Sequence, residues 1–383
     1  MRSFIPQEGG LSNLAFSRSL FAFLSVAVVI VGMGFLVNSP GCKTSVIGPD
    51  SLLADTTSHS FVWRVDTLGD GNSSVLFDVS ILNVNDIWCV GQIFLKDSLG
   101  QFDPQMYNAA HWDGTLWNLL RISVRDFGGN TGIFTLRSVR AFSGSDVWFV
   151  SDADLIHWDG ASFQGEAFFA QSLPFDGQVR YLYGDNANDL YCVGRSGSVF
   201  HVASNGWQSV PSGTSIDLID MFRANDHLWI AGCASDYSKS ILLVGDGTIW
   251  TISWDSSVAS SQPYSGSVQS VWGPASDSVV VVGGGSVYRQ RYDGSGIARK
   301  EQIDLGNYAT RVRGQSSNDI VIVGYGGMLW HFNGNSWKRA NSLSDSNHIF
   351  LSVAIRGDII VAVGADYNVA VPPRGLVAIG TRK

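Results

Sequence analysis

The stretch from His111 to Trp117, HWDGTLW, places a histidine two residues before an aspartate, a spacing that suits a metal-ligand pair or a proton relay. The same phrase returns along the chain. It reads HWDGASF from His157, HVASNGW from His201, GDGTIW from Gly245, RYDGSGI from Arg291 and HFNGNSW from His331. A catalytic site is needed once, so a phrase that recurs in this way indicates repeated architecture.

A second repeated phrase is a short apolar run closed by a small residue, as in NDIWCVG, which ends at Gly91. The closing residues of seven such runs are Gly91, Ser151, Gly194, Gly232, Gly283, Gly324 and Gly364. Successive closing residues lie 38 to 60 positions apart, a period typical of β-propeller blades. The apolar spacing of three and four residues that marks helical repeats is missing.

Each unit contains four segments with the character of β-strands. One strand precedes the apolar run, and a third strand, an Asp-Gly or Asn-Gly turn and a fourth strand follow it. The fourth strand opens at Trp117, Phe163, Trp207, Trp250 or Trp337. Tight turns of this kind join antiparallel strands. Such a four-stranded blade has two apolar faces that only its neighbours can cover, so we predict an all-β, seven-bladed β-propeller.

The seventh unit lacks a fourth strand after RGLVAIGTRK. The segment FVWRVDT, from Phe61 to Thr67, matches the segments that follow the Asp-Gly turns, and Trp63 stands where they carry their opening aromatic residue. We therefore expect this N-terminal strand to complete the last blade and close the ring. Trp63 should then lie beside the strand around Leu376 to Ile379.

The N-terminal 58 residues differ from the rest. Residues 1–41 contain an uncharged apolar run, Leu20 to Val37, which predicts an export signal or a membrane anchor. The SPGC that follows resembles the cleavage box of bacterial lipoproteins, although Ser39 stands where that family prefers an aliphatic residue. The resemblance implies lipidation of Cys42; ordinary cleavage and an uncleaved anchor are the alternatives. All three place a flexible tether, 42–58, and the propeller, 59–383, outside the cytoplasm.

The combined pattern of N-D-x-W-x-V-G and x-H-x-D-G-x-x-W, from about Ser60 to Lys383, resembles the repeat of exported bacterial β-propeller lipoproteins and envelope proteins of largely unassigned function. It is also distantly similar to the Asp-box propellers of sialidases and photosystem assembly factors. Those place a residue between Asp and Gly and continue with Thr-Trp, so this chain departs from them. The resemblance implies the fold and an exported protein, not sialidase activity.

The overall charge excludes one class of partner. The formal net charge is -8, only 15% of the residues are charged, and the pI is near 5.3. Nucleic acid demands a basic face, so we expect no nucleic-acid partner. Among the cysteines, Cys89 and Cys192 occupy the same position of two separated repeats, and Cys233 follows Gly232 in a third. We interpret all three as small buried hydrophobes and not as disulfide partners.

Little in the chain announces catalysis. Four histidines share one repeat position: His111, His157, His201 and His331. A ring sets them too far apart to share a metal, whose ligands lie within about 2 to 2.5 Å of the ion, so we assign them a structural role. The aspartates of the hairpin turns are Asp113, Asp159, Asp246 and Asp293. The only glutamates after the apolar segment are Glu166 and Glu301, and no facing carboxylate pair is evident. We predict no metal site and no cofactor.

Function in a repeat protein is expected where the repeats differ. The innermost strands supply a variable column: Ser80, Arg140, Tyr183, Asp220, Trp272, Arg313 and Ala354. Arginines, an aspartate and aromatic residues around one axis suit an anionic or glycan ligand. The alternative is that these side chains only plug the channel.

The long connections are a second candidate. The second-to-third and blade-to-blade loops should share one face, and they carry the aromatic residues Phe102, Tyr107, Phe127, Phe168, Phe175, Trp254, Tyr264 and Tyr367. Aromatic enrichment is typical of recognition surfaces. The alternative is that the loops only shield blade edges.

We therefore expect a monomeric, membrane-tethered, non-enzymatic propeller that binds a protein or a polysaccharide of the envelope or exterior. The alternative is a carbohydrate-active enzyme, a hydrolase or lyase, that works at the axial mouth with Asp220 and with Arg140 or Arg313.

Overall fold

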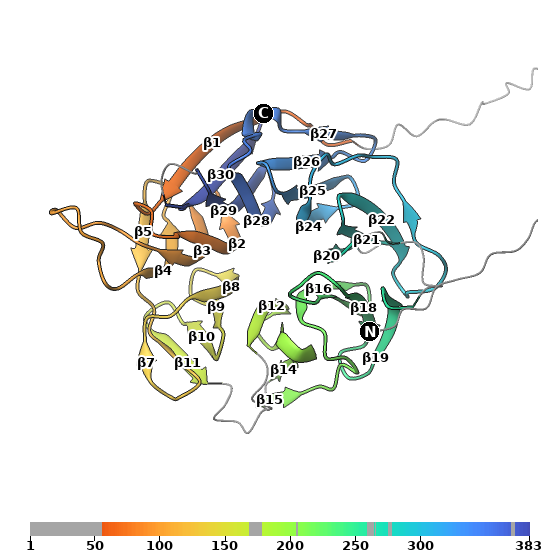
Figure 1. The fold of residues 1–383 in the computed structure, drawn as a ribbon, viewed down its shortest axis with the longest axis horizontal. Coiled ribbons are helices and arrows are strands. Elements are labelled where there is room, and N and C mark those ends of the chain that lie inside the picture. The colour runs from red at the N-terminus through yellow and green to blue at the C-terminus, as the bar shows by residue number, and fades with distance from the viewer. Residues whose placement is uncertain are drawn as a thin grey trace, which may run out of the picture. The chain divides into compact units, whose positions relative to one another are not determined.

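A computed structural model of the 383-residue chain describes residues 56–167, 178–203, 206–258, 264, 266–274, 278–368 and 372–383. Seven four-stranded antiparallel sheets in these ranges are arranged as blades around one axis (Figure 1). The predicted seven-bladed propeller is confirmed. The expectations for residues 1–41 and for Cys42 lie outside the described residues. Within the described ranges, no helix has the length and apolar composition that crossing a membrane requires.

The strands of the first four blades follow one another from the axis outward. The first blade has β2 (Val75–Asn83), β3 (Asp86–Ile93), β4 (Tyr107–Trp112) and β5 (Trp117–Leu120). The second has β8 (Leu136–Ser143), β9 (Asp146–Ser151), β10 (Asp154–Trp158) and β11 (Phe163–Ala167). The third has β12 (Val179–Asn186), β13 (Asp189–Gly194), β14 (Val199–Ala203) and β15 (Gly206–Ser209). The fourth has β16 (Leu218–Ala224), β17 (His227–Cys233), β18 (Ser240–Gly245) and β19 (Trp250–Asp255).

The remaining blades keep the same order. The fifth has β20 (Val268–Trp272), β21 (Ser278–Gly283), β22 (Ser286–Arg291) and β23 (Arg299–Lys300). The sixth has β24 (Ala309–Ser316), β25 (Asp319–Gly324), β26 (Met328–Phe332) and β27 (Trp337–Arg339). The seventh has β28 (His348–Arg356), β29 (Ile359–Asp366), β30 (Arg374–Arg382) and, outermost, β1 (Phe61–Leu68). A two-stranded ribbon, β6 (Val124–Arg125) with β7 (Thr131–Gly132), stands between the first two blades.

The closing strand pairs as predicted. β1 lies antiparallel to β30, with Trp63 opposite Gly380 and Thr67 opposite Leu376. The indole of Trp63 covers Gly380 so closely that a Cβ atom there would lie 2.7 Å from the ring. The last blade is therefore completed by the N-terminal strand, which locks the ring shut.

The hydrophobic core consists of seven clusters, each shared by two adjacent blades. In β3, Cys89 belongs to the cluster between the seventh and first blades, whereas Trp88 and Val90 belong to the cluster between the first and second. Successive side chains of a strand point to opposite faces of its sheet. An uninterrupted apolar run is thus what a sheet covered on both faces requires. Cys89, Cys192 and Cys233 are buried free thiols, as predicted.

The recurrent histidines are structural. Each donates a hydrogen bond from Nε2 to the aspartate that opens the second strand of its blade. The pairs are His111–Asp86, His157–Asp146, His201–Asp189 and His331–Asp319, at 2.9, 2.9, 2.8 and 2.7 Å. In the first three blades the imidazole also stacks on an aromatic ring of the second strand, with centroids 4.1 to 4.3 Å apart. The histidine of this repeated motif therefore ties the third strand of its blade to the second.

The Asp-Gly turns are also structural. Asp246 accepts hydrogen bonds from the backbone N–H groups of Ile249 and Thr248, which lower its pKa to about 2. Gly247 follows with a φ of 97°, a conformation that favours glycine. In this hairpin, the aspartate caps the backbone N–H groups of the turn and the glycine adopts the positive φ that the turn requires.

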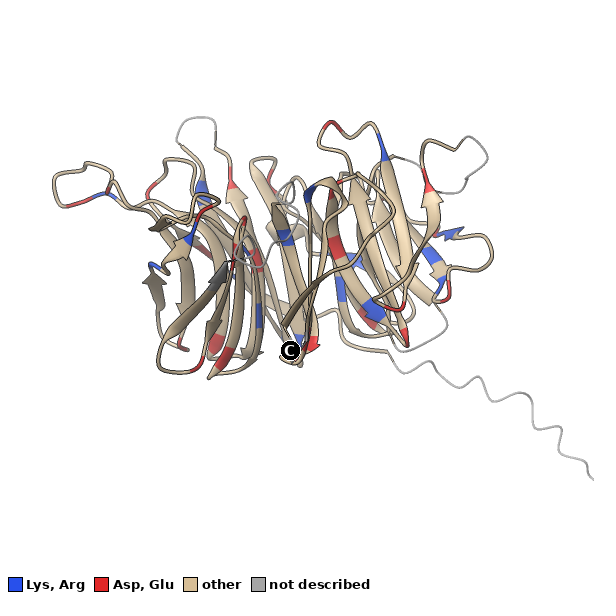
Figure 2. Ribbon diagram, turned by 90° about the horizontal axis from the view of Figure 1, so that it is seen from below, with Lys and Arg blue, Asp and Glu red and all other residues tan. Residues whose placement is uncertain are grey.

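The two faces of the ring differ. Inner strands end on the face that carries the inner turns and the Asp-Gly hairpins, which we call the short-turn face. The second-to-third and blade-to-blade connections lie on the opposite, long-loop face. Figure 2 shows the ring edge-on, with the C-terminus at the short-turn edge. The N-terminal segment joins the propeller on the short-turn face, because Thr57 donates to Asn333 O at 3.2 Å and, through its hydroxyl, to Asn318 O at 2.7 Å.

Just before the closing strand, His59 and His331 meet with their Nδ1 atoms 2.8 Å apart. Burial, with the neighbouring positive charges of His331, Lys338 and Arg382, lowers the pKa of His59 to about 4, although Asp319 opposes them. The native state thus favours neutral His59.

This arrangement predicts a pH-dependent closure. The unfolded chain takes up a proton on His59 near pH 6.5, and the native state does so only near pH 4, so stability should be full above pH 6.5 and fall as the pH drops toward 4. Thermal unfolding of the wild type and of His59→Gln, followed from pH 7.5 to 4, tests this. His59→Gln should flatten the profile, whereas His348→Gln, at the other face, should keep its slope. An unchanged slope in His59→Gln would contradict the assignment.

Candidate functional site

A belt of polar side chains crosses the axis at mid-height. Each inner strand contributes one member, at equivalent register: Asp78, Ser138, Tyr181, Asp220, Ser270, Arg311 and Ser352. Asp220 is fully buried and accepts hydrogen bonds from Ser270 Oγ and from Arg313. Asp78 accepts from Ser138 Oγ and from Ser352 Oγ, the latter at 2.7 Å. This polar belt lies between two separate mouths, one on each face of the ring.

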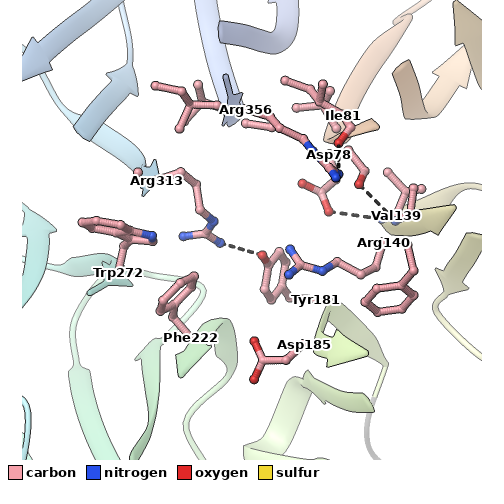
Figure 3. Close-up of a pocket in the computed structure, with 18 residues that line it drawn as sticks. Asp78, Ile81, Val139, Arg140, Tyr181, Asp185, Phe222, Trp272, Arg313 and Arg356 are labelled. Carbon is pink, nitrogen blue, oxygen red and sulfur yellow. Dashed lines mark hydrogen bonds between the residues drawn. The ribbon is translucent and has the colours of Figure 1, made fainter. Parts of the chain in front are cut away.

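Two arginines share the one carboxylate of Asp220. Arg311 Nη1 and Arg313 Nη2 lie 2.6 and 2.5 Å from Asp220 Oδ1. Burial alone would raise the pKa of Asp220, but the two guanidinium groups hold it below its ordinary value. Arg313 Nη2 also donates to the hydroxyl of Tyr181 at 2.7 Å (Figure 3). The two guanidinium groups therefore favour the charged form of Asp220, which is a buried structural counter-ion.

The short-turn mouth is a cavity of about 440 Å³. Of the predicted axial column, Ser80, Arg140, Trp272, Arg313 and Ala354 line it (Figure 3). Tyr183 does not, because it is 1% exposed, but its hydroxyl donates to Asp185 at 2.5 Å, and Asp185 lines the cavity. Arg140 crosses to the third blade, where its Nε donates to Gly184 O at 2.9 Å.

The predicted column is wrong at the fourth blade. Phe222, which pairs with Trp229, holds the position that Ser80 and Arg140 hold in the first two blades, while Asp220 belongs to the belt two residues earlier. The prediction took the apolar Ile219 for the residue that packs between blades and therefore placed the column member at Asp220, two residues before its true position at Phe222. The enzyme hypothesis placed Asp220 at the axial mouth, yet this carboxylate is enclosed by Arg311, Arg313 and Ser270 and does not line the short-turn mouth.

The long-loop mouth, a cavity of about 410 Å³, is built by a feature that sequence reasoning missed. Every inner strand carries a β-bulge just before its belt residue, so two residues oppose one on the second strand. The extra residues are Phe77, Arg137, Arg180, Ile219, Gln269, Thr310 and Leu351, and all seven line this mouth. We call them the bulge ring.

The closing glycines of the repeat are the sequence signal of these bulges. The bulged inner strand passes so close that a Cβ atom on Gly91 or Gly324 would lie 2.0 Å from a backbone oxygen of that strand. The close approach favours a residue without a side chain, and six of the seven runs end in glycine, whereas the second blade places the small Ser151 there. The repeated V-G thus marks where an inner side chain turns into the mouth.

Arginine dominates one side of the bulge ring. Arg137 Nε donates to Asp152 Oδ1 at 2.8 Å, and Arg195 Nε, from the loop beside it, lies 4.0 Å from Asp217 Oδ2. Among the described residues, Arg180 has a hydrogen bond to Gln178 Oε1 at 3.1 Å and no carboxylate partner. Burial and the charge of Arg137 lower its pKa.

Tyrosines supply the other side. Tyr308 lies between Tyr237 and Tyr325, with edge-to-face contacts at 6.2 and 5.8 Å between ring centroids, and all three line the mouth. They come from short connections that face the axis, whereas the prediction relied on the longest loops.

The predicted loop aromatics are scattered. Trp254 and Tyr264 are 6% and 5% exposed and pack in the core between the fourth and fifth blades, so their assignment to a contact surface is wrong. Phe102 lies under Lys96 and Tyr107 under Arg121, and Phe127 is partly buried. Phe168 and Phe175 lie outside the described residues. In the described part of the chain, no group of three or more His, Cys, Asp and Glu side chains is suited to a metal ion.

Solved structures share this fold. YCF48 bound to D1 peptide has a TM-score of 0.60 and is 14% identical over 84% of this chain and 97% of that one. YCF48 from Cyanidioschyzon merolae has a TM-score of 0.56 at 16% identity, covering 83% and 98%. The WD40 propeller domain of Doa1 has a TM-score of 0.54 at 12% identity, covering 84% and 97%. At these identities the likeness shows the fold alone. No protein-family model and no curated protein matches the sequence.

The buried charges yield a stability prediction. Asp220→Asn leaves Arg311 and Arg313 without their carboxylate, which should destabilise the fold by about 3–5 kcal/mol in chemical denaturation. The exposed turn variant Asp246→Asn should change the unfolding midpoint far less. An Asp220→Asn protein of wild-type stability would show that the belt does not hold the axis together.

Proposed function

We propose that this protein is a non-enzymatic binding module that receives a protein partner at the long-loop mouth. The observation that carries the proposal is the bulge ring. Seven equivalent bulges aim one side chain each into the same cavity, and these side chains include arginine, aromatic, aliphatic and amide groups. β-bulges are typical of places where a sheet re-aims side chains for function.

The polar groups of this mouth also favour a ligand over a plugged channel. Arg311 Nε is buried and has no hydrogen-bond acceptor among the described residues. Buried donors in native proteins are nearly always satisfied, and one that is not points to a missing partner. At the short-turn mouth, by comparison, Arg313 and Arg140 already donate to groups of the protein.

We further propose the cellular setting that the sequence resemblance implies: an exported bacterial propeller protein of the envelope, tethered through a lipid on Cys42. The N-terminal segment enters at Thr57 on the short-turn face. This attachment point lies on the face opposite the long-loop mouth. The 15 residues from Cys42 to Thr57 span about 50 Å when fully extended.

The comparisons support a peptide-like partner by analogy only. YCF48, a propeller of the same fold, has been solved bound to D1 peptide. That complex is an example of a protein of this fold that holds a polypeptide ligand.

Partner capture tests the binding proposal. Full-length protein would be cross-linked in the membranes of its own host and compared with a Tyr237→Ala, Tyr325→Ala double variant of the long-loop mouth and with Arg140→Ala at the short-turn mouth. Both tyrosines are well exposed, at 59% and 37%, so their loss should leave the fold intact. We expect captured partner to fall about tenfold or more in the double variant, because exposed aromatics carry much of an interface's energy, and to stay unchanged in Arg140→Ala. The reverse pattern would refute this location.

The tether has its own test. Mass spectrometry of the mature protein should find Cys42 as its first residue and carrying a lipid, and fractionation should place that protein in the membrane. Cys42→Ser should abolish the lipid adduct. A mature N-terminus without a lipid, or one that retains residues 1–41, would contradict the lipid tether.

A further inference from the structure

We infer that the long-loop mouth recognises an acidic segment of a polypeptide, with side-chain carboxylates seated on Arg180 and Arg311. This inference rests on the proposed binding function and assigns the chemistry of its ligand. The long-loop mouth is lined by four arginines and one aspartate, although the net charge of the protein is -8.

The first observation is an imbalance of charge. Arg137 and Arg195 have their own counter-ions, Asp152 and Asp217. The charges of both arginines and both aspartates act on Arg180, and together with burial they lower its pKa. Neither carboxylate forms an ion pair with it. Among the described residues, Arg180 therefore lines the cavity without a direct carboxylate partner.

The second observation is the position of Arg311. Its Nη1 lies 2.6 Å from Asp220 Oδ1, an oxygen that Arg313 also contacts, and within the described residues neither its buried Nε nor its buried Nη1 makes a hydrogen bond. Its guanidinium lies 4.7 Å from the ring centroid of Tyr181, which fixes the plane of the group. Arg311 lines the long-loop mouth, so a ligand oxygen that enters there reaches a pre-oriented donor.

The chemistry of these groups selects a carboxylate. A guanidinium presents parallel N–H groups in a rigid fork that matches the two oxygens of a carboxylate. The bulge ring also contributes three apolar side chains, Phe77, Ile219 and Leu351, from the first, fourth and seventh blades, and the tyrosines lie beside them. A peptide with an acidic side chain flanked by apolar ones would pair its carboxylate with the arginines and pack its apolar side chains against the apolar and tyrosine residues of the mouth.

A glycan fits less well. Each sugar hydroxyl both donates and accepts, so a glycan site needs acceptors as well as donors. The charged side chains of the lining are four arginines, which only donate, and Asp217, which already accepts from Ser196 N at 3.1 Å and faces Arg195; the other acceptors are neutral hydroxyl and amide groups. This excess of positive charge favours an anionic ligand over a neutral sugar. The cavity of about 410 Å³ accommodates a few residues of an extended chain.

The test uses a displayed heptapeptide library and the full-length protein in detergent micelles. Peptides selected by the wild type should be enriched in Asp or Glu beside an apolar residue, and Arg180→Gln should lose that enrichment. Arg299→Gln, an exposed arginine of the fifth blade, is the matched control and should keep it. The best peptide and its Glu→Gln or Asp→Asn counterpart are then compared by calorimetry with the wild type. The acidic form should bind about tenfold tighter or more, since hydrogen bonds to charged groups are the strong ones.

Each outcome has a distinct meaning. Selection of peptides without acidic enrichment, or equal affinity for the acidic and amide forms, overturns the inference while the binding function stands if partner capture still depends on the long-loop mouth. Tighter binding of an oligogalacturonate than of any peptide assigns the mouth to acidic glycans and also overturns it. Loss of both peptide selection and mouth-dependent capture removes the proposed function itself. The comparison of acidic and amide peptides needs no protein variant, so misfolding of Arg180→Gln leaves the test intact.

Discussion

Each blade of this propeller has two apolar faces, and neither is covered by the blade itself. All seven core clusters lie between adjacent blades, so the second strands, such as β3, contribute alternate residues to two different clusters. No blade has a core of its own, and the hydrophobic driving force is fully realised only when every neighbour is in place. The Asp–His pairs, the Asp-Gly turns and the pairing of β1 with β30 all serve this closed arrangement.

The same repetition that builds the scaffold builds the mouth. A glycine at the end of each apolar run admits a bulged inner strand, and the bulge turns one side chain toward the axis. The same β-bulge occurs in all seven inner strands, and a serine replaces the closing glycine in one of the seven runs. The side chain at the bulge differs from blade to blade, from Phe77 to Arg180. Architecture and recognition are thereby separated: the glycines hold the geometry, and single residues set the chemistry.

Features that recur in every repeat could be predicted from the sequence, whereas features that interrupt the strand periodicity could not. The number of blades, the closing strand with Trp63 and the structural histidines follow from periodicity and are confirmed. A bulge breaks the two-residue period of a strand, so Ile219 imitated a packing residue and Asp220 was placed in the wrong ring. Trp254 and Tyr264 were misassigned because loop length does not reveal which neighbour covers a side chain.

The pairing of β1 with β30 has a consequence for how the chain matures. β1 is the earliest strand to be delivered and the last to find its partner, because everything from Val75 to Arg382 must arrive first. Its contacts have the largest sequence separation in the propeller, and such contacts form slowly. A chain delivered vectorially therefore waits with the outer edge of β30 unpaired and with the faces of its terminal blades exposed. The final step of its biogenesis is a single zippering event, and a factor that shields exposed strand edges would be needed only until that moment.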